Sequence, residues 1–257
     1  MLILGPIIWD LREPVENFHG RNDVIEEIQE KLNNASAVVV SALGGCGKTQ
    51  TVAKFVQLHK EEYHSVIWLV APNIQTSLQE IVGILTSTEN QPNLSVLQAS
   101  QRISELTRNS KVLIVVDDVF EEHLKNLTTL IRNISSSKFL IATQLSDISG
   151  IAPNIKTIDF PKFTDEESKQ FLRRNTRQAP EEAIEKLSSE LKAFPLCLQQ
   201  AVSYINKHNI QIPTYITSFR DCKKQILDPK KKYSEYDKTL MTVWSVAFEI
   251  TPQKFLQ

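Results

Sequence analysis

The stretch SALGGCGKTQT, Ser41 to Thr51, holds three of the seven glycines in a chain of 257 residues. Glycine averages ~7% of residues in proteins, so this chain uses it sparingly elsewhere. Glycine is needed where the backbone takes a positive φ or where another group approaches the backbone closely. The cluster follows an apolar run, Ala37 to Val40, and ends at Lys48. The glycines therefore mark a turn that another group approaches closely.

ALGGCGKT, residues 42–49, matches the pattern [AG]-x-x-x-x-G-K-[ST] of a phosphate-binding loop. In such a loop the backbone N–H groups of residues 44–49 point into one concavity at a helix N-terminus and cradle phosphates. Lys48 supplies a compact positive charge to the β- and γ-phosphates, and the Thr49 hydroxyl reaches Mg²⁺. The alternative is a glycine-rich connection that binds no ligand.

A second motif supplies the carboxylates that a magnesium-nucleotide site needs. The run VLIVVDD ends in Asp117 and Asp118, and open α/β sheets bind ligands at the carboxyl ends of their strands. We expect Asp117 on the metal side and Asp118 as the residue that orients or deprotonates an attacking water. The alternative is that the two acids only begin a loop.

Strand-like and helix-like segments alternate over the first 160 residues, which predicts an α/β fold with a parallel sheet. The strands are expected at residues 37–40, 64–71, 111–118, 138–144 and 155–160. The helices between them include one with Val24, Ile25, Ile28 and Leu32 at helical spacing, for which Asn22 or Asp23 is the candidate N-cap, one that begins at Lys48, and one at residues 75–87.

The pattern changes after Phe160, where only helical periodicity follows. Thr164 and Glu167 form a capping-box pattern, and Pro180 stands where a helix begins. We expect helices at residues 164–174, 180–192, 196–208, 213–227 and about 235–250. The chain is thus predicted to continue from the α/β domain into a smaller all-α part.

Composition excludes several classes of protein. The formal net charge of −1 gives no global field that would favour nucleic acid or an anionic membrane. The chain has no run of about 18 apolar residues that could span a bilayer. Its three cysteines, Cys46, Cys197 and Cys222, have neither disulfide nor metal spacing. We therefore expect a cytoplasmic protein with no nucleic-acid and no membrane partner.

Several segments together resemble the NB-ARC nucleotide-binding domain of the STAND branch of AAA+-like P-loop ATPases, found in apoptosome scaffolds, plant resistance proteins and repeat-bearing sensors. The matching segments are FHGRNDVIEEI (18–28), ALGGCGKTQTVAKF (42–55), HSVIWLVA (64–71), VLIVVDDV (112–119), KFLIATQ (138–144), AFPLCLQQAVSYI (193–205) and DKTLMTVWSVAFEI (237–250). The resemblance implies a lead-in segment at 1–20, a P-loop α/β domain at 21–162, a helical subdomain at 163–232, and the start of a winged-helix region at 233–257.

The resemblance also implies roles for individual residues. His19 and Arg21 would lie against the base and sugar of the nucleotide, and Pro195 would contact the adenine from the helical part. The phosphates would be held by Gly44, Gly45, Cys46, Gly47, Lys48, Thr49 and Gln50, with Thr49 and Asp117 on Mg²⁺. The alternatives are that His19 and Arg21 are ordinary surface residues and that Pro195 only begins a helix.

Gln144 departs from the family pattern, in which the corresponding strand ends in Thr-Thr-Arg and the arginine faces the γ-phosphate. An arginine at such a position is worth ~10³–10⁵ in turnover in other phosphoryl-transfer enzymes. Gln144 can donate a hydrogen bond but carries no charge. We expect ATP hydrolysis to be slow or absent, and ATP to be distinguished only weakly from ADP. The family's later Met-His-Asp motif does not occur in the sequence.

The sequence therefore predicts an ADP- or ATP-binding switch that also needs Mg²⁺. Bound ADP would hold a closed form, and exchange for ATP would favour an open form that self-associates or binds other subunits of a signalling complex. One alternative is an active ATPase or phosphotransferase, in which Lys48 and Asp118 would be catalytic. The other is a degenerate nucleotide-binding scaffold that acts only through protein contacts.

Overall fold

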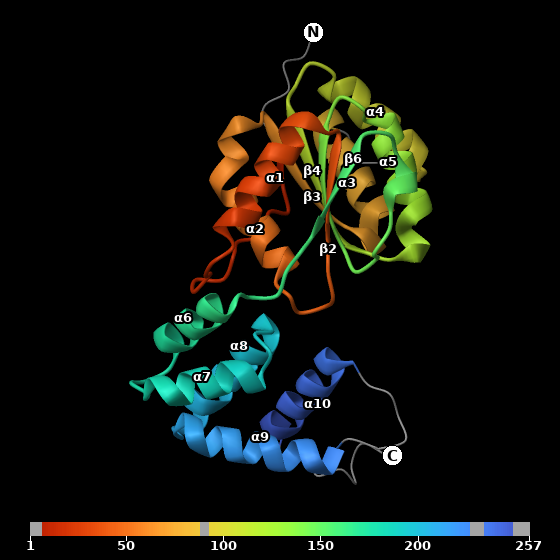
Figure 1. Cartoon of the computed structure of the whole chain (residues 1–257). Helices are drawn as coiled ribbons and strands as arrows, with labels where there is room; N and C mark the ends of the chain where they lie inside the picture. Colours follow the sequence, from red (N-terminus) through yellow and green to blue (C-terminus); the bar gives the residue numbers. More distant parts are fainter. Residues whose placement is uncertain (1–6, 88–92, 227–233, 249–257) are drawn as a thin grey trace. The chain divides into compact units, whose positions relative to one another are not determined.

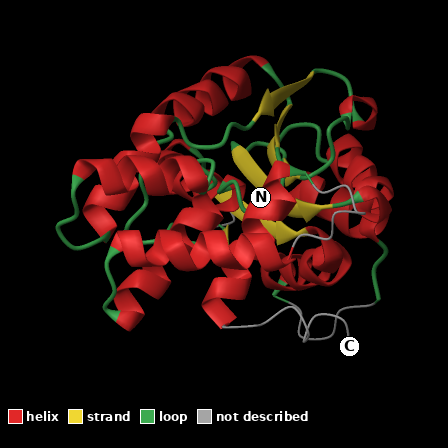
Figure 2. Cartoon of the chain, turned by 60° about the horizontal axis from the view of Figure 1, so that its bottom comes forward, coloured by secondary structure: helices red, strands yellow, loops and turns green. Residues whose placement is uncertain are grey.

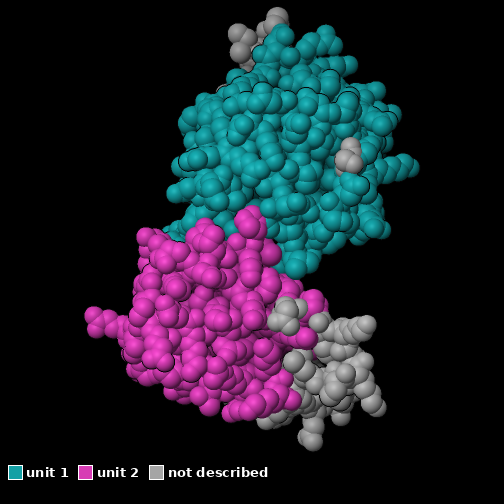
Figure 3. Space-filling view, viewed as in Figure 1, with its two compact units in different colours: residues 1–44, 48–160 teal, residues 45–47, 161–257 magenta. Residues whose placement is uncertain are grey.

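A computed structural model describes residues 7–87, 93–226 and 234–248 of the chain. The chain divides into two compact units, one of residues 1–44 and 48–160 and the other of residues 45–47 and 161–257 (Figure 3). The first unit is an α/β domain and the second contains helices only within its described residues. The finer boundaries predicted at 162/163 and 232/233 stay predictions.

The first unit is built on a six-stranded sheet with the order β1-β3-β4-β5-β2-β6. All five neighbouring pairs are parallel. The strands are β1 (Ile8–Trp9), β2 (Ala37–Ser41), β3 (Ser65–Val70), β4 (Val112–Val119), β5 (Lys138–Thr143) and β6 (Ile155–Asp159). Every residue of β2 is buried, as expected of a parallel strand covered on both faces. The predicted parallel P-loop sheet is confirmed.

Helices cover both faces of this sheet (Figures 1 and 2). On one face lie α3 (Ile74–Thr86), α4 (Val96–Thr107) and α5 (Leu124–Asn133), whose apolar residues form one core with alternate residues of the strands. On the other face lie α1 (Asn22–Asn34) and α2 (Lys48–His59) (Figure 1). Short 3₁₀ turns occupy 60–62, 71–73, 121–123 and 149–151.

The second unit has a separate apolar core to which all five of its described helices contribute. They are α6 (Asp165–Asn175), α7 (Glu181–Glu190), α8 (Pro195–His208), α9 (Ile212–Ile226) and α10 (Glu235–Phe248). The predicted capping box is present: Thr164 and Glu167 bond reciprocally at the start of α6. The ends predicted for the last two helices, residue 227 and residues 249–250, lie outside the described residues.

Three local details of the structure differ from the sequence predictions. The N-cap of α1 is Arg21, not Asn22 or Asp23, because Gly20 and Arg21 both have positive φ and turn the chain into the helix. Pro180 is the N-cap of α7 rather than its first residue, since its ψ of 141° is extended. Strand β1 was not predicted; in it, Ile8 and Trp9 pair with β3.

Candidate nucleotide-binding site

Three strands bring the predicted site residues to one edge of the sheet. Strand β5 lies between β2, which leads into the glycine loop, and β4, which ends in the acidic pair. Because all the strands are parallel, their carboxyl ends share an edge. The loop after β2, Gln144 after β5 and Asp117 in β4 therefore meet there, although Gln144 lies 100 residues after Gly44 in the sequence. The sequence alone identified the loop and the acids, and the strand order joins them.

The glycine loop has the conformation that its composition predicts. Gly45 has a φ of 74° and Gly47 a φ of 95°, values that residues other than glycine rarely adopt. Gly44 is not in this region of φ, and a Cβ built on it would lie 3.5 Å from Gln144 Oε1. Two glycines thus serve the turn, and the third lies close to a polar side chain of the same site.

Lys48 and Thr49 begin α2, directly after the loop. The Lys48 ammonium donates hydrogen bonds to the carbonyl oxygens of Ala42 at 2.8 Å and Leu43 at 2.9 Å. The Thr49 hydroxyl donates to Asp117 Oδ1 at 3.1 Å. The two halves of the predicted magnesium site, which are 68 residues apart in sequence, are therefore in direct contact.

Asp117 is a buried acid, only 2% exposed. Its Oδ1 accepts from Thr49 and from the backbone N–H of Asp118 at 3.0 Å. Its Oδ2 is buried and has no hydrogen-bond partner among the described residues. Burial raises the pKa of Asp117, and the negative charge of Asp118 raises it further. A buried carboxylate oxygen without a donor, beside a threonine hydroxyl, fits the outer coordination of Mg²⁺, a hard cation that prefers oxygen ligands.

Asp118 differs from its neighbour in exposure and in backbone conformation. It is exposed, and its φ is 56°. A non-glycine residue at positive φ is uncommon and frequently marks a functional constraint. Its assignment as the water-orienting residue stays a prediction.

Arg21 is buried, at 3% exposure, and its guanidinium lies 4.5 Å from the centre of the Phe160 ring. The alternative that it is an ordinary surface arginine is therefore wrong. His19, two residues earlier, is half-buried. That these two residues lie against base and sugar stays a prediction.

Gln144 is exposed and follows β5 directly. Its neighbour Thr143 fixes the end of that strand: the Thr143 hydroxyl donates to Val119 O at 2.7 Å and accepts from Leu145 N at 3.0 Å. The Gln144 amide thus lies beside Gly44 at the end of an ordered strand. Its role toward a γ-phosphate stays a prediction.

The remaining predicted residues have identifiable structural positions. Gln50 Oε1 accepts a hydrogen bond from Val15 N at 2.9 Å. Cys46 is 4% exposed. Pro195 belongs to the second unit and is the first residue of α8, where a proline costs no hydrogen bond. Its predicted contact with adenine stays a prediction.

Arg12 is a site residue that the sequence did not indicate. Its Nη1 lies 3.8 Å from Asp117 Oδ2, and its guanidinium lies 5.9 Å from the centre of the Trp68 ring. A single arginine in the lead-in segment is part of no hydrophobic periodicity and of no recognisable motif, so the sequence gives no signal for its role. Only the path of the backbone brings it to the acid.

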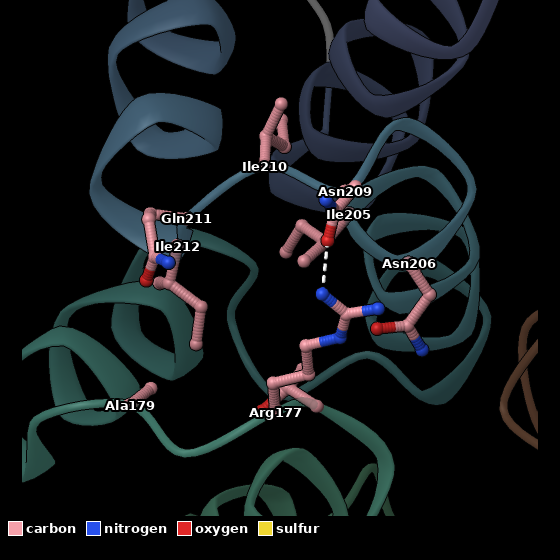
Figure 4. A pocket seen from close by; sticks show the side chains of 9 residues that line it. Arg177, Ala179, Ile205, Asn206, Asn209, Ile210, Gln211 and Ile212 are labelled. Carbon is pink, nitrogen blue, oxygen red and sulfur yellow. Dashed lines mark hydrogen bonds between the residues drawn. The ribbon is translucent and has the colours of Figure 1, made fainter.

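Other features of the described residues do not compete with this site. The hollow in Figure 4 lies in the second unit, between Arg177 and the turn from α8 to α9, and Arg177 bonds to Asn209 across it. Its volume of about 30 Å³ leaves room for only one or two water molecules. No group of three His, Cys, Asp or Glu with metal-binding geometry occurs in the described part of the chain. None of the helices described there could cross a membrane.

Comparison with known proteins gives a family match. A sequence model of the NB-ARC domain matches residues 21–182. A relative named as a probable disease resistance protein of Arabidopsis thaliana is 28% identical over 138 residues, which are 49% of this chain and 16% of the relative. The chain therefore spans about a sixth of that protein's length.

Two solved structures share the fold. The Walker-type ATPase of Pyrococcus abyssi has a TM-score of 0.60 at 14% identity, over 84% of this chain and 76% of its own. A signal transduction ATPase with numerous domains from Pyrococcus horikoshii, which carries a tetratricopeptide repeat sensor, has a TM-score of 0.57 at 17% identity, over 93% of this chain and 41% of its own. At these identities the likeness is one of fold.

Proposed function

Because this chain belongs to the NB-ARC family of nucleotide-binding domains, we propose that it is the ADP/ATP switch module of a signalling protein. The observation that carries the proposal is the hydrogen bond of 3.1 Å from Thr49 to Asp117. It joins the phosphate loop to the acidic strand in the arrangement that magnesium-nucleotide binding requires.

Each residue has a defined task in this proposal. The backbone N–H groups of residues 44–50 and the N-terminus of α2 hold the phosphates. The Lys48 ammonium exchanges its bonds to Ala42 O and Leu43 O for the β- and γ-phosphates. Thr49 binds Mg²⁺ directly and Asp117 holds it through water. His19, Arg21 and Pro195 bind the base and sugar.

Hydrolysis in this site is slow or absent. The end of β5 offers the neutral Gln144 beside Gly44, so no positive charge from that position stabilises the transition state. Asp118 is exposed and orients water at best weakly. We expect turnover below roughly 1 s⁻¹, because the site lacks the ~10³–10⁵-fold gain in turnover that a well-placed arginine supplies.

The switch acts through differential binding, since a ligand shifts a conformational equilibrium only by its different affinities for the two states. The ADP form is closed, and the ATP form is open and self-associates or binds other subunits. The relatives named for disease resistance and for signal transduction support a signalling role. The net charge of −1 supports protein partners over nucleic acid, and we propose the cytoplasm as the location.

Two other functions make different demands on the same site. An active ATPase or phosphotransferase, with Lys48 and Asp118 catalytic, needs a turnover well above 1 s⁻¹. A degenerate scaffold needs no nucleotide affinity. The buried Asp117 oxygen without a donor disfavours the scaffold, because such a group is costly unless a ligand compensates it.

The test first identifies the nucleotide that copurifies with the protein. Calorimetry then measures the binding of ADP and ATP with and without Mg²⁺, and the binding of single-stranded DNA, for which we expect none. Lys48→Ala removes the phosphate-binding charge, and Lys54→Ala, on the same helix and bonded to Gln57, is the matched control. We expect micromolar or tighter nucleotide binding that is lost in Lys48→Ala and kept in Lys54→Ala. Equal binding by both variants, or none by the wild type, would refute the proposal.

A further inference from the structure

The lead-in segment is attached to the α/β unit at two places. The first is strand β1, in which Ile8 and Trp9 pair with Val66 and Ile67 of β3. Just before it, Val66 N donates to Ile7 O at 2.9 Å, and Ile7 N donates to Ser65 Oγ at 3.0 Å. The sheet therefore gains an edge strand, and this strand runs toward the carboxyl ends of its neighbours, where the site lies.

The second attachment is to α2, the helix that follows the phosphate loop. Val15 N donates to Gln50 Oε1 at 2.9 Å, and Gln57 Nε2 donates to Glu13 Oε2 at 3.1 Å. Residues 10–14 form the crossing from the edge strand to α2, and along it Arg12 lies near Trp68 of β3 and Asp117 of β4. The chain holds this crossing at both ends.

Arg12 lies in the middle of the crossing and is the cation that it brings to the site. Its Nη1 is 3.8 Å from Asp117 Oδ2, and its side chain is 43% exposed while that of Asp117 is 2% exposed. At 3.8 Å this is an ion pair without a hydrogen bond, and the arginine end of the pair is open to solvent. The contact is loose enough to be exchanged for a stronger one.

We propose that Arg12 recognises the terminal phosphate of a bound nucleoside triphosphate and so distinguishes ATP from ADP. This rests on the proposed function. Engagement of Asp117 by Mg²⁺ frees the guanidinium, which turns to the phosphate, where it forms paired, charge-assisted hydrogen bonds. Arg12 reaches the site from the β3 and β4 side, whereas Lys48 and the loop hold the phosphates from β2. The charge that Gln144 lacks thus comes from the opposite end of the domain's sequence.

The experiment compares Arg12→Ala with the wild type for binding of Mg²⁺ with ADP and with the non-hydrolysable triphosphate AMPPCP, by calorimetry on the full chain. We expect the AMPPCP affinity to fall about tenfold or more and the ADP affinity to change less than twofold. Arg12→Lys keeps a charge without the paired geometry and should lie between. Arg102→Ala, an exposed arginine paired with Glu105, is the control and should change neither affinity.

An equal loss for both nucleotides, no loss, or a gain in AMPPCP affinity would overturn the proposal; the last would mean that Arg12 only competes with Mg²⁺ for Asp117. A lower melting temperature of Arg12→Ala would point to an effect on folding. Arg12→Lys then distinguishes the two roles, because a cation with a purely structural role would restore the ADP and AMPPCP affinities together. If the wild type binds with a Lys48 requirement but Arg12→Ala still discriminates normally, only this inference fails. If the wild type binds no nucleotide, the proposed function fails and this inference with it.

Discussion

Helices α2 and α6 begin in opposite ways. At α6, Thr164 Oγ1 accepts from Glu167 N at 3.1 Å and Glu167 Oε2 accepts from Thr164 N at 2.8 Å, and the first turn contains three acids. At α2 the first turn, fully described in the structure, has no acid and begins with Lys48. Asp, Glu and capping oxygens normally complement the positive end of a helix. The start of α6 is satisfied by its own residues, whereas that of α2 is left to an external anion.

The same contrast explains the acid and the cations around α2. A helix start that holds phosphates gathers negative charge, which needs Mg²⁺ and positive side chains to balance it. Asp117 serves the metal, while Lys48 and, by our inference, Arg12 serve the phosphates. The predictions below alter one such charge at a time, from the largest expected effect on nucleotide binding to none.

Asp117→Asn should have the largest effect. An outer-sphere metal partner of this kind is worth about 10–100-fold in metal affinity, so the strengthening of ATP binding by Mg²⁺ should fall by that factor. Calorimetry with and without Mg²⁺ measures it. Wild-type Mg²⁺ dependence in the variant would show that Asp117 does not serve the metal.

The same substitution should stabilise the protein when neither nucleotide nor Mg²⁺ is present. Burial raises the pKa of Asp117 above its unfolded value, so the stability contributed by the protonated acid is present below the unfolded pKa and lost as pH rises through the folded pKa. Asparagine avoids this loss. We expect a gain of roughly 2–4 °C in Tm at pH 7 that vanishes toward about pH 4. Glu26→Gln, which removes an acid at an exposed position of α1, is the control and should show no such gain.

Much of this site could be predicted from sequence because its parts are local patterns. The buried run of β2, the two glycines at positive φ and the acids that end the β4 run are each encoded within a few adjacent residues. Helices α2, α3 and α6 to α8 follow from apolar spacing in the same way. These elements begin or end within about two residues of their predicted positions, the usual error at helix and strand ends.

What could not be predicted depends on long-range packing. Strand β1 has only two residues, too few to show a period. The N-cap at Arg21 is set by positive φ and by its stacking on Phe160, 139 residues later in the sequence. Arg12 meets Asp117 only because the lead-in segment is attached at both ends. No local pattern contains these contacts.

Gln144→Arg should strengthen the anion site at the start of α2. The new charge lies beside Gly44, next to the phosphates, and a hydrogen bond to a charged group is worth about 1.5–3 kcal/mol. We expect the ratio of ATP to ADP affinity to rise about tenfold. In an Arg12→Ala background the same change should restore discrimination. Gln144→Met adds no charge and is the control. If Gln144→Arg gives the same ratio of ATP to ADP affinity as Gln144→Met, residue 144 lies away from the terminal phosphate.

Gln50→Glu should make α2 resemble α6 by placing an acid in its first turn. Glutamate keeps the oxygen that accepts from Val15 N, so the lead-in segment stays attached. An acid there is worth about 0.3–1 kcal/mol, so nucleotide affinity should fall about two- to fivefold and the nucleotide-free protein should gain similar stability. Glu167→Gln makes the reverse change in α6 and should lower Tm without altering affinity. Unchanged nucleotide affinity in Gln50→Glu would contradict an anion site at this terminus.

Thr164→Ala should leave nucleotide binding unchanged, because it alters only the helix start that is already satisfied. The variant removes the hydroxyl that accepts from Glu167 N, a loss of about 1 kcal/mol that lowers Tm by roughly 2–4 °C. Thr164→Ser keeps the hydroxyl and should melt as the wild type does. Titration of both variants with ADP completes the comparison. A drop in ADP affinity confined to Thr164→Ala would mean that the start of α6 is linked to nucleotide occupancy, and the two helix termini could then no longer be treated as independent.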